Sequence, residues 1–267
     1  MTFFLKFFLV SIFLLQSSFF AQKRISYDLQ ILYSDSLKKN FTMNLDINND
    51  KVYFYDAEFV DPRYSKYKTS ETGQFVTRNN GGHENIMFVQ DFHSNYYKIK
   101  TNDIIEWNLT SDYKTVDKYK LQKATASFGG RIWNVWFCND IPLMEGPYKF
   151  NGLPGLVFEV SENTNVFKYT LIKIENLTKN LTSLEFNDKS LAFITWDRYT
   201  KMMNDFYENP YLEERNILQQ GGEFIYNDRK LTLQELSQMT KEFQNGLKKN
   251  IPPMVEMDKT LFRGKNN

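Results

Sequence analysis

Apolar and polar residues alternate one by one through much of the first 175 residues. Residues 25–33 are the clearest case, because every second residue is apolar, and the residues between them are polar except for Leu32: Ile25, Tyr27, Leu29, Ile31 and Tyr33. Successive side chains of a β-strand point to opposite faces, so this pattern predicts a strand with one buried and one solvated face. Residues 41–47 repeat the pattern, and the polar run at 48–50 predicts a turn into a third strand at 52–55.

The same reasoning predicts further short strands, and it predicts no helix between them. Asn79, Asn80, Gly81 and Gly82 form a good hairpin turn, because Asn and Gly tolerate a positive φ. Strands at this spacing, without intervening helical periodicity, argue against a parallel sheet with crossover helices. We therefore expect a mainly β protein with a single antiparallel, curved sheet or half-barrel. The remaining predicted strands are 75–77, 86–90, 96–99, 104–109, 116–125, 131–138, 157–160, 166–174 and 181–186.

The pattern changes to helical spacing in the C-terminal third, at about 190–250. Apolar residues at mixed three- and four-residue intervals predict a helix over 190–207, which ends before Asn209-Pro210. A short strand is expected at 224–226. Thr232 followed by Glu235 is a capping-box arrangement and predicts the start of a second helix, which closes at Asn250.

Residues 1–21 have the layout of a secretory signal peptide. Lys6 is followed by an apolar run that is too short for a comfortable membrane span, and Ala21 suits the last position before a cleavage site. We expect cleavage before Gln22 and a single domain over 22–267, with no transmembrane span after cleavage. The expected location is periplasmic, outer-membrane-associated or secreted.

The charge of the chain argues against nucleic acid as a partner, and its cysteine content excludes an internal disulfide. Lys and Arg total 33 against 32 Asp and Glu, and removal of 1–21 takes away Lys6 alone, so the remaining chain is formally neutral. A neutral chain lacks the basic excess that nucleic-acid binders use, and nucleic acid is therefore not an expected partner. Cys138 is the sole cysteine and cannot form an internal disulfide; strand alternation predicts a packed thiol rather than a nucleophile.

The histidines do not predict a metal site. His83 and His93 flank a predicted strand, and an extended chain would hold them about 30 Å apart, too far to share one ion. The sequence also contains no nucleophile–base spacing and no phosphate-binding loop. We therefore predict no metal, no cofactor and no catalytic residue.

Residues 133–160 are the most constrained stretch of the chain. They hold two tryptophans and the cysteine, and Gly-Pro and Pro-Gly pairs fix much of the backbone. Gly152 and Gly155 are expected at turn positions, with Leu153 and Leu156 anchoring the loop in the core. Trp133 and Trp136 are separated by an odd number of residues, so on one strand they point to opposite faces and only one belongs to the core.

This stretch resembles the GLPGLI family of exported bacterial proteins. The resemblance covers residues 107–160, with a weaker similarity at 25–27, and the hexapeptide at 152–157 reads GLPGLV. Residues 250–256 are similar to a family ending of Asn-Pro-apolar-Glu, here with a second proline. The residues that carry the resemblance, and that we single out as a structural or binding motif, are Arg131, Trp133, Trp136, Pro142, Gly146, Pro147, Gly152, Leu153, Pro154 and Gly155.

The resemblance implies export in bacteria with complex envelopes, but it implies no activity. Two function classes stay open. We favour a non-catalytic binding or assembly protein whose partner is an apolar ligand or lipid, a glycan, or another envelope protein. The alternative is a secreted hydrolase that uses carboxylates such as Asp140, Glu145 and Glu159, although scattered carboxylates more often lie on a solvated surface.

Overall fold

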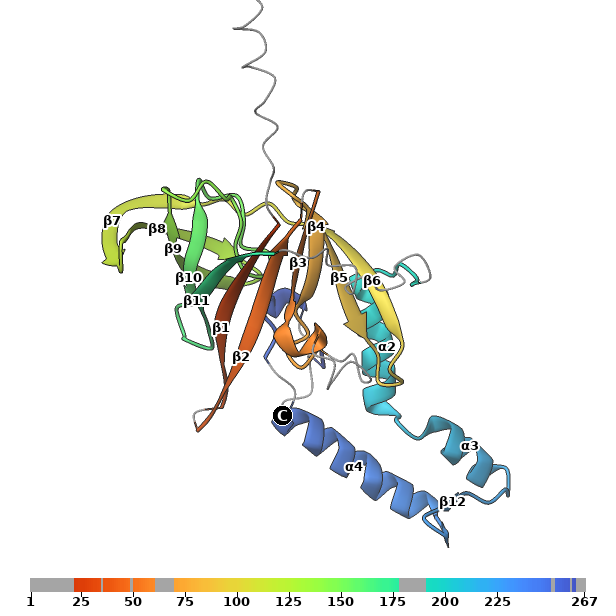
Figure 1. Ribbon diagram of the computed structural model, residues 1–267. Coiled ribbons are helices and arrows are strands. Elements are labelled where there is room, and N and C mark those ends of the chain that lie inside the picture. The colour runs from red at the N-terminus through yellow and green to blue at the C-terminus, as the bar shows by residue number, and fades with distance from the viewer. Residues whose placement is uncertain are drawn as a thin grey trace, which may run out of the picture.

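The computed structural model shows a curved β-sheet with helices in its C-terminal part (Figure 1). The predicted signal peptide at 1–21 and the predicted strand at 181–186 lie outside the described residues. The structure describes residues 22–34, 36–48, 50–60, 70–177, 191–250, 253–259 and 261–262.

The described residues form one sheet of eleven strands, in the order β6-β5-β4-β3-β2-β1-β11-β10-β9-β8-β7. Every neighbouring pair is antiparallel, which confirms the predicted fold class. The strands are β1 (Lys23–Ser34), β2 (Leu37–Ile47), β3 (Lys51–Asp56), β4 (Phe75–Asn79), β5 (Glu84–Gln90), β6 (Tyr96–Asn102), β7 (Asn108–Val116), β8 (Tyr119–Phe128), β9 (Arg131–Cys138), β10 (Leu156–Glu162) and β11 (Phe167–Asn176).

Two meanders meet in the middle of this sheet. Strands β1 to β6 run outward to one edge, β7 to β11 run inward from the other, and β1 joins them by pairing with β11. Leu29 on β1 lies opposite Phe41 on β2 and Tyr169 on β11. The alternating apolar residues of β1 therefore lie at the centre of the sheet, where Ile25, Tyr27, Leu29 and Ile31 are fully buried.

The connection between the two edge strands forces the sheet to curve. In a flat sheet, eleven strands about 4.8 Å apart would place β6 and β7 about 48 Å from each other. The link from Asn102 to Asn108 can span only about 21 Å even when fully extended. The sheet therefore bends until its two edges approach, and it stays open because β6 and β7 do not pair.

The larger core lies on the face that we call the inner face. It combines the inward residues of nearly every strand with the segment 139–155, which connects β9 to β10 and contributes Tyr148, Phe150 and Leu153. The opposite, outer face carries a smaller aromatic cluster, in which Phe75 and Phe88 lie 4.6 Å apart between ring centroids. Thus consecutive residues of β4 and β5 serve two separate cores.

In the described part of the chain, three α-helices follow the sheet, and they cover little of it. Figure 1 shows α2 (Trp196–Glu208) beside β5 and β6, whereas α3 (Leu212–Gln219) and α4 (Leu233–Asn250) extend away from the sheet. None of the helices in the described ranges is both long and apolar enough to cross a membrane. The shorter elements are η1 (Ala57–Val60), the hairpin of β12 (Ile225–Tyr226) and β13 (Arg229–Lys230), and η4 (Met257–Lys259).

The predicted start of α4 is confirmed in detail. The Thr232 hydroxyl accepts from the Glu235 N–H at 3.2 Å, and the Glu235 carboxylate accepts from the Thr232 N–H at 2.8 Å. This reciprocal pair satisfies two donors that the first turn of a helix leaves free. The helix ends at Asn250, as predicted.

Several predicted boundaries are wrong. Residues 103–107 are not a strand, and the strand predicted over 116–125 is interrupted by a turn in which Asp117 has φ 52°. The helix predicted from residue 190 begins at Trp196, because the Thr195 side chain caps it by accepting from the Arg198 N–H. Helix α3 was not predicted, since none of its residues is buried and it lacks an apolar stripe.

Gly155 offers a direct test of the packing between β9 and segment 139–155. A Cβ at Gly155 would overlap the carbonyl oxygen of Cys138, whereas a Cβ at Gly246 in α4 would meet no atom within 4 Å. We expect Gly155→Ala to lower the free energy of unfolding by about 1–3 kcal/mol through backbone displacement. The control Gly246→Ala should raise it by roughly 0.5–1 kcal/mol, because alanine favours a helix. Urea unfolding measures both, and equal effects would contradict this packing.

Candidate functional site

The segment 139–155 is held against the inner face by aromatic packing. The fully buried Trp133 ring lies 4.6 Å from the Phe150 ring, and its indole N–H donates to the Phe128 carbonyl oxygen at 3.0 Å. Leu153 and Leu156 are also buried. Trp133 therefore forms the floor beneath the segment.

The most unusual residue of the segment is Lys149, whose side chain is fully buried. Its ammonium lies 2.9 Å from the Asp103 carboxylate and 2.7 Å from the Glu256 carboxylate. An ammonium in an apolar interior is very unfavourable unless opposite charges compensate it, and the two carboxylates supply that compensation. The three residues come from the β6–β7 link, segment 139–155 and the C-terminal segment, which are distant in sequence.

Tyr148 strengthens the link to the C-terminal segment. Its hydroxyl donates to the same Glu256 oxygen that Lys149 contacts. Burial, followed by the nearby charge of Glu256, raises the pKa of Tyr148 well above the ordinary value of a tyrosine. The hydroxyl therefore remains a donor at all physiological pH values.

Arg78 on β4 binds the other half of the segment. Its guanidinium pairs with the buried Glu145 carboxylate and donates to the Tyr148 carbonyl oxygen at 2.7 Å. A guanidinium has five N–H donors in a planar fork, so it can satisfy a carboxylate and a main-chain carbonyl together. The segment is thus fixed to β4 at Glu145 and Tyr148, whereas Lys149 fixes it to the β6–β7 link and the C-terminal segment.

Arg131, the first motif residue, binds the main chain of the C-terminal segment. It donates to the carbonyl oxygens of Met254 and Val255 at 3.0 Å each and pairs with Glu162 at 3.4 Å. Burial by itself raises the pKa of Glu162, but hydrogen bonds from Thr164 and Val166 and the charge of Arg131 hold it below the ordinary glutamate value. Glu162 therefore stays ionised beside Arg131.

The remaining motif residues shape the backbone. Gly146 is required because a Cβ would overlap the Phe150 carbonyl oxygen, and Gly152 has φ +88°, which favours glycine. The Pro147 carbonyl oxygen accepts from the Phe150 N–H at 3.0 Å and closes a tight turn. Pro142 and Pro154 are exposed.

Trp136 lies on the outer face, opposite Trp133, as the odd spacing predicts. It is half-buried, and the Lys114 ammonium lies 4.5 Å from its ring centroid and 2.7 Å from the Glu159 carboxylate. Glu159 pairs with Trp136 across β9 and β10, so it also lies on the outer face. Glu145 faces the interior and Asp140 is exposed, so the structure does not bring these three carboxylates together.

The other residues considered from the sequence are dispersed. His83 and His93 are exposed beyond opposite ends of β5, and the His93 ring lies 4.9 Å from the Phe206 ring. Cys138 is a free, fully buried thiol in the inner core.

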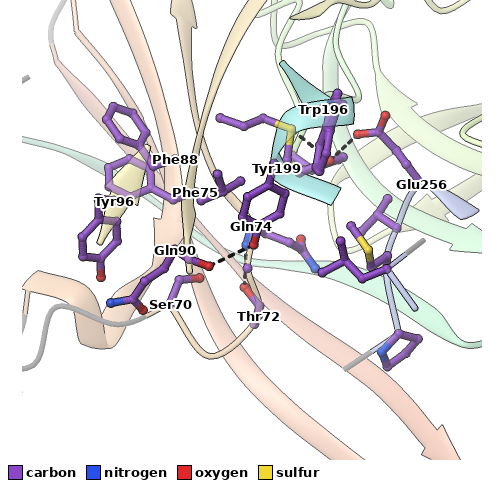
Figure 2. A pocket seen from close by; sticks show the side chains of 18 of the residues that line it. Ser70, Thr72, Gln74, Phe75, Phe88, Gln90, Tyr96, Trp196, Tyr199 and Glu256 are labelled. Atoms are coloured by element: carbon purple, nitrogen blue, oxygen red, sulfur yellow. Dashed lines mark hydrogen bonds between the residues drawn. The ribbon is translucent and has the colours of Figure 1, made fainter. Parts of the chain in front are cut away.

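A cavity of about 240 Å³ adjoins the buried network, by which we mean the ion pairs and hydrogen bonds that join Arg78, Glu145, Tyr148, Lys149, Asp103 and Glu256. It lies between β4, β5, the start of α2 and the C-terminal segment, and Tyr148 and Glu256 form part of its wall. Figure 2 shows Phe75, Phe88 and Tyr96 on its left side and Trp196 and Glu256 on its right. The aromatic side chains of the remaining wall are Phe59 and Tyr199, and the aliphatic ones are Met87, Val89, Pro253, Met254, Val255 and Leu261.

Sequence reasoning missed this cavity. Its walls come from six stretches that are separate in the chain, at 59, 70–75, 87–96, 148, 196–199 and 253–261, and each aromatic residue reads locally as an ordinary core residue. The similarity of residues 250–256 to a family ending was the one signal that pointed to part of its wall.

Residues 131–159 match the model of a family described as Porph_ging, a protein of unknown function. The match begins at Arg131 and includes Glu145 and Lys149, whereas their partners Arg78, Asp103 and Glu256 lie outside it. The matched residues are therefore one half of the buried network.

The fold is similar to part of a larger protein of known structure. Two structures of PNGF-II, in the C2 and P21 space groups, align with TM-scores of 0.54 and 0.53 at 19% and 18% identity. Each alignment covers 68% of this chain and 33% of the PNGF-II chain, so this chain matches about one third of that protein's length. The chain matches none of the curated proteins. At this identity the similarity concerns the fold alone.

The two motif tryptophans should differ in their contribution to stability. Trp133→Ala removes a fully buried ring and the floor of segment 139–155, and we expect a loss of about 3–5 kcal/mol in the free energy of unfolding. Trp136→Ala removes a half-buried ring and should cost about 1 kcal/mol. Urea unfolding of both variants measures the difference, and losses of the same size would refute the assignment of the two faces.

Proposed function

We propose that this chain is an exported, non-catalytic envelope protein, similar to the GLPGLI family, that binds a small and mainly apolar ligand in the cavity beside Tyr148 and Glu256. The observation that carries the proposal is the cavity itself, with its aromatic walls. Concave sites lined by apolar and aromatic side chains, with a few polar groups, are typical of small-molecule binding.

The size and chemistry of the cavity favour an apolar ligand over a sugar. A cavity of about 150 Å³ can hold benzene, so 240 Å³ has room for a ligand of about ten non-hydrogen atoms. A sugar ring of that size has several hydroxyl groups, and each buried one needs a hydrogen-bond partner. The wall offers mostly ring and aliphatic surface, which suits a hydrocarbon chain or ring better.

The geometry supports binding more than hydrolysis. Acid–base catalysis by two carboxylates requires that both reach one scissile bond. Glu145 is engaged with Arg78 in the interior, Glu159 with Lys114 on the outer face, and Asp140 is exposed. No pair of these carboxylates faces a common space.

Export is part of the proposal and rests on residues 1–21. Their apolar run and small residues suit a cleaved signal peptide. We place the protein in the periplasm, at the outer membrane or outside the cell, where a lipid or another small apolar compound would be its partner.

The test is to purify the protein from the cell envelope without denaturation and to identify by mass spectrometry what remains bound. We expect an apolar compound in about equimolar amount with the wild type. Val89→Phe adds a ring inside the cavity and should abolish retention. Ile132→Phe makes the same type of change at a residue that is 53% exposed on β9, and it should retain the ligand.

The outcomes separate the function classes. A bound glycan, or a bound protein in place of a small molecule, would contradict the proposal. Equal retention by Val89→Phe and Ile132→Phe would show that the compound binds elsewhere. Thermal melting of both variants verifies that loss of the compound does not result from loss of the fold.

A further inference from the structure

Two hydrogen-bond donors in the cavity wall are buried without a partner. They are the amide nitrogen Nε2 of Gln74 and the indole nitrogen Nε1 of Trp196, and neither donates to any group in the part of the chain that the structure describes. Gln74 is 3% exposed. Buried donors are nearly always paired, so two orphans in the wall of one cavity call for an explanation.

The orientation of the Gln74 amide is fixed by Tyr169. The Tyr169 hydroxyl, which is fully buried, donates to Gln74 Oε1 at 2.7 Å. Burial raises the pKa of Tyr169, so its hydroxyl stays protonated and needs an acceptor. Rotation of the amide would remove that acceptor, and Gln74 must therefore present its NH₂ group as the free end.

Trp196 offers the second donor from the first turn of α2. Its position is set by the Thr195 cap and by an edge-on contact with Tyr199, whose ring centroid lies 5.8 Å away. The indole N–H can donate but cannot accept. Both orphan groups therefore require an acceptor from outside the described wall.

The charges of the wall indicate that this acceptor is neutral. No Lys or Arg is among the described residues that line the cavity, and Glu256 is already engaged by Tyr148 and Lys149. A carboxylate or phosphate ligand would be buried beside Glu256 without a counter-charge, which is strongly unfavourable. A carbonyl oxygen satisfies a donor without that penalty.

We propose that the ligand is a neutral, mainly apolar molecule with a carbonyl-type oxygen, such as an ester or a ketone, which accepts hydrogen bonds from Gln74 and Trp196. This inference rests on the proposed function and specifies its ligand class. The cavity supplies apolar contact for the body of the ligand, and the two donors select its polar end.

Three molecules of one shape test the proposal: acetophenone, cumene and benzoate. Cumene replaces the carbonyl oxygen of acetophenone by a methyl group, and benzoate replaces the acetyl methyl by a charged oxygen. We would measure the three affinities by ligand-observed NMR for the wild type and for variants. Because cumene is the more hydrophobic, the informative quantity is the ratio of acetophenone to cumene affinity and its change on mutation.

Two variants remove the donors without leaving a new orphan. Trp196→Phe deletes the indole N–H and keeps a ring, and Gln74→Met with Tyr169→Phe deletes both members of their hydrogen bond. Each should lower the ratio about fivefold, the effect of one lost hydrogen bond. The control Trp107→Phe removes an indole N–H that already donates to the Asn151 carbonyl oxygen, and it should leave the ratio unchanged.

Each result bears on a different claim. If cumene and acetophenone bind but neither variant changes the ratio, the carbonyl-type acceptor is refuted while the apolar binding function stands. Benzoate binding more tightly than acetophenone would overturn the neutral ligand class. If neither cumene nor acetophenone binds, the proposed function fails together with the inference.

Discussion

The buried ammonium of Lys149 is the interaction on which the architecture depends. It lies inside the curved sheet between the carboxylates of Asp103 and Glu256, which compensate its charge in the interior. Asp103 belongs to the short link that draws the two sheet edges together. Glu256 belongs to the C-terminal segment that forms part of the cavity wall. The ammonium of Lys149 thus connects three parts of the structure: the link between the sheet edges, the motif segment and the wall of the cavity.

This arrangement explains why the backbone of the motif segment is tightly constrained although the segment contains no predicted catalytic group. Gly146 and Gly155 allow main-chain contacts too close for a Cβ, Arg78 binds the carbonyl oxygen of Tyr148, and Arg131 binds that of Val255 in the C-terminal segment. Such a segment acts as an internal brace between the two meanders. The cavity lies between segment 139–155, the C-terminal segment and α2, and apolar side chains line it. The motif therefore contributes to the proposed binding site mainly by positioning its wall.

Local pattern was sufficient for the central strands but not for the edge of the sheet at β7 or for the site. Period-two alternation predicted the central strands because burial of one face is a local property, and the odd spacing of Trp133 and Trp136 predicted their opposite faces. Trp196 and Gln74 could not be recognised as cavity residues. What distinguishes them is a buried donor without a hydrogen-bond partner, and this is visible only in the folded structure. The pairing of Lys149 with Glu256, over a hundred residues away, likewise has no local signal. A lysine in a strand-rich sequence is expected at the surface.

The central claim, that Lys149 and Glu256 fix the C-terminal segment to the motif, is tested most directly by a double-mutant cycle with Lys149→Met and Glu256→Gln in urea unfolding. Each single change leaves a buried charge poorly compensated and should cost about 3–5 kcal/mol. The double variant should lose less than the combined single losses, with a coupling of about 1–3 kcal/mol. The half-exposed pair Lys114 and Glu159 should give a coupling below about 1 kcal/mol. Additive losses for Lys149 and Glu256 would contradict the account.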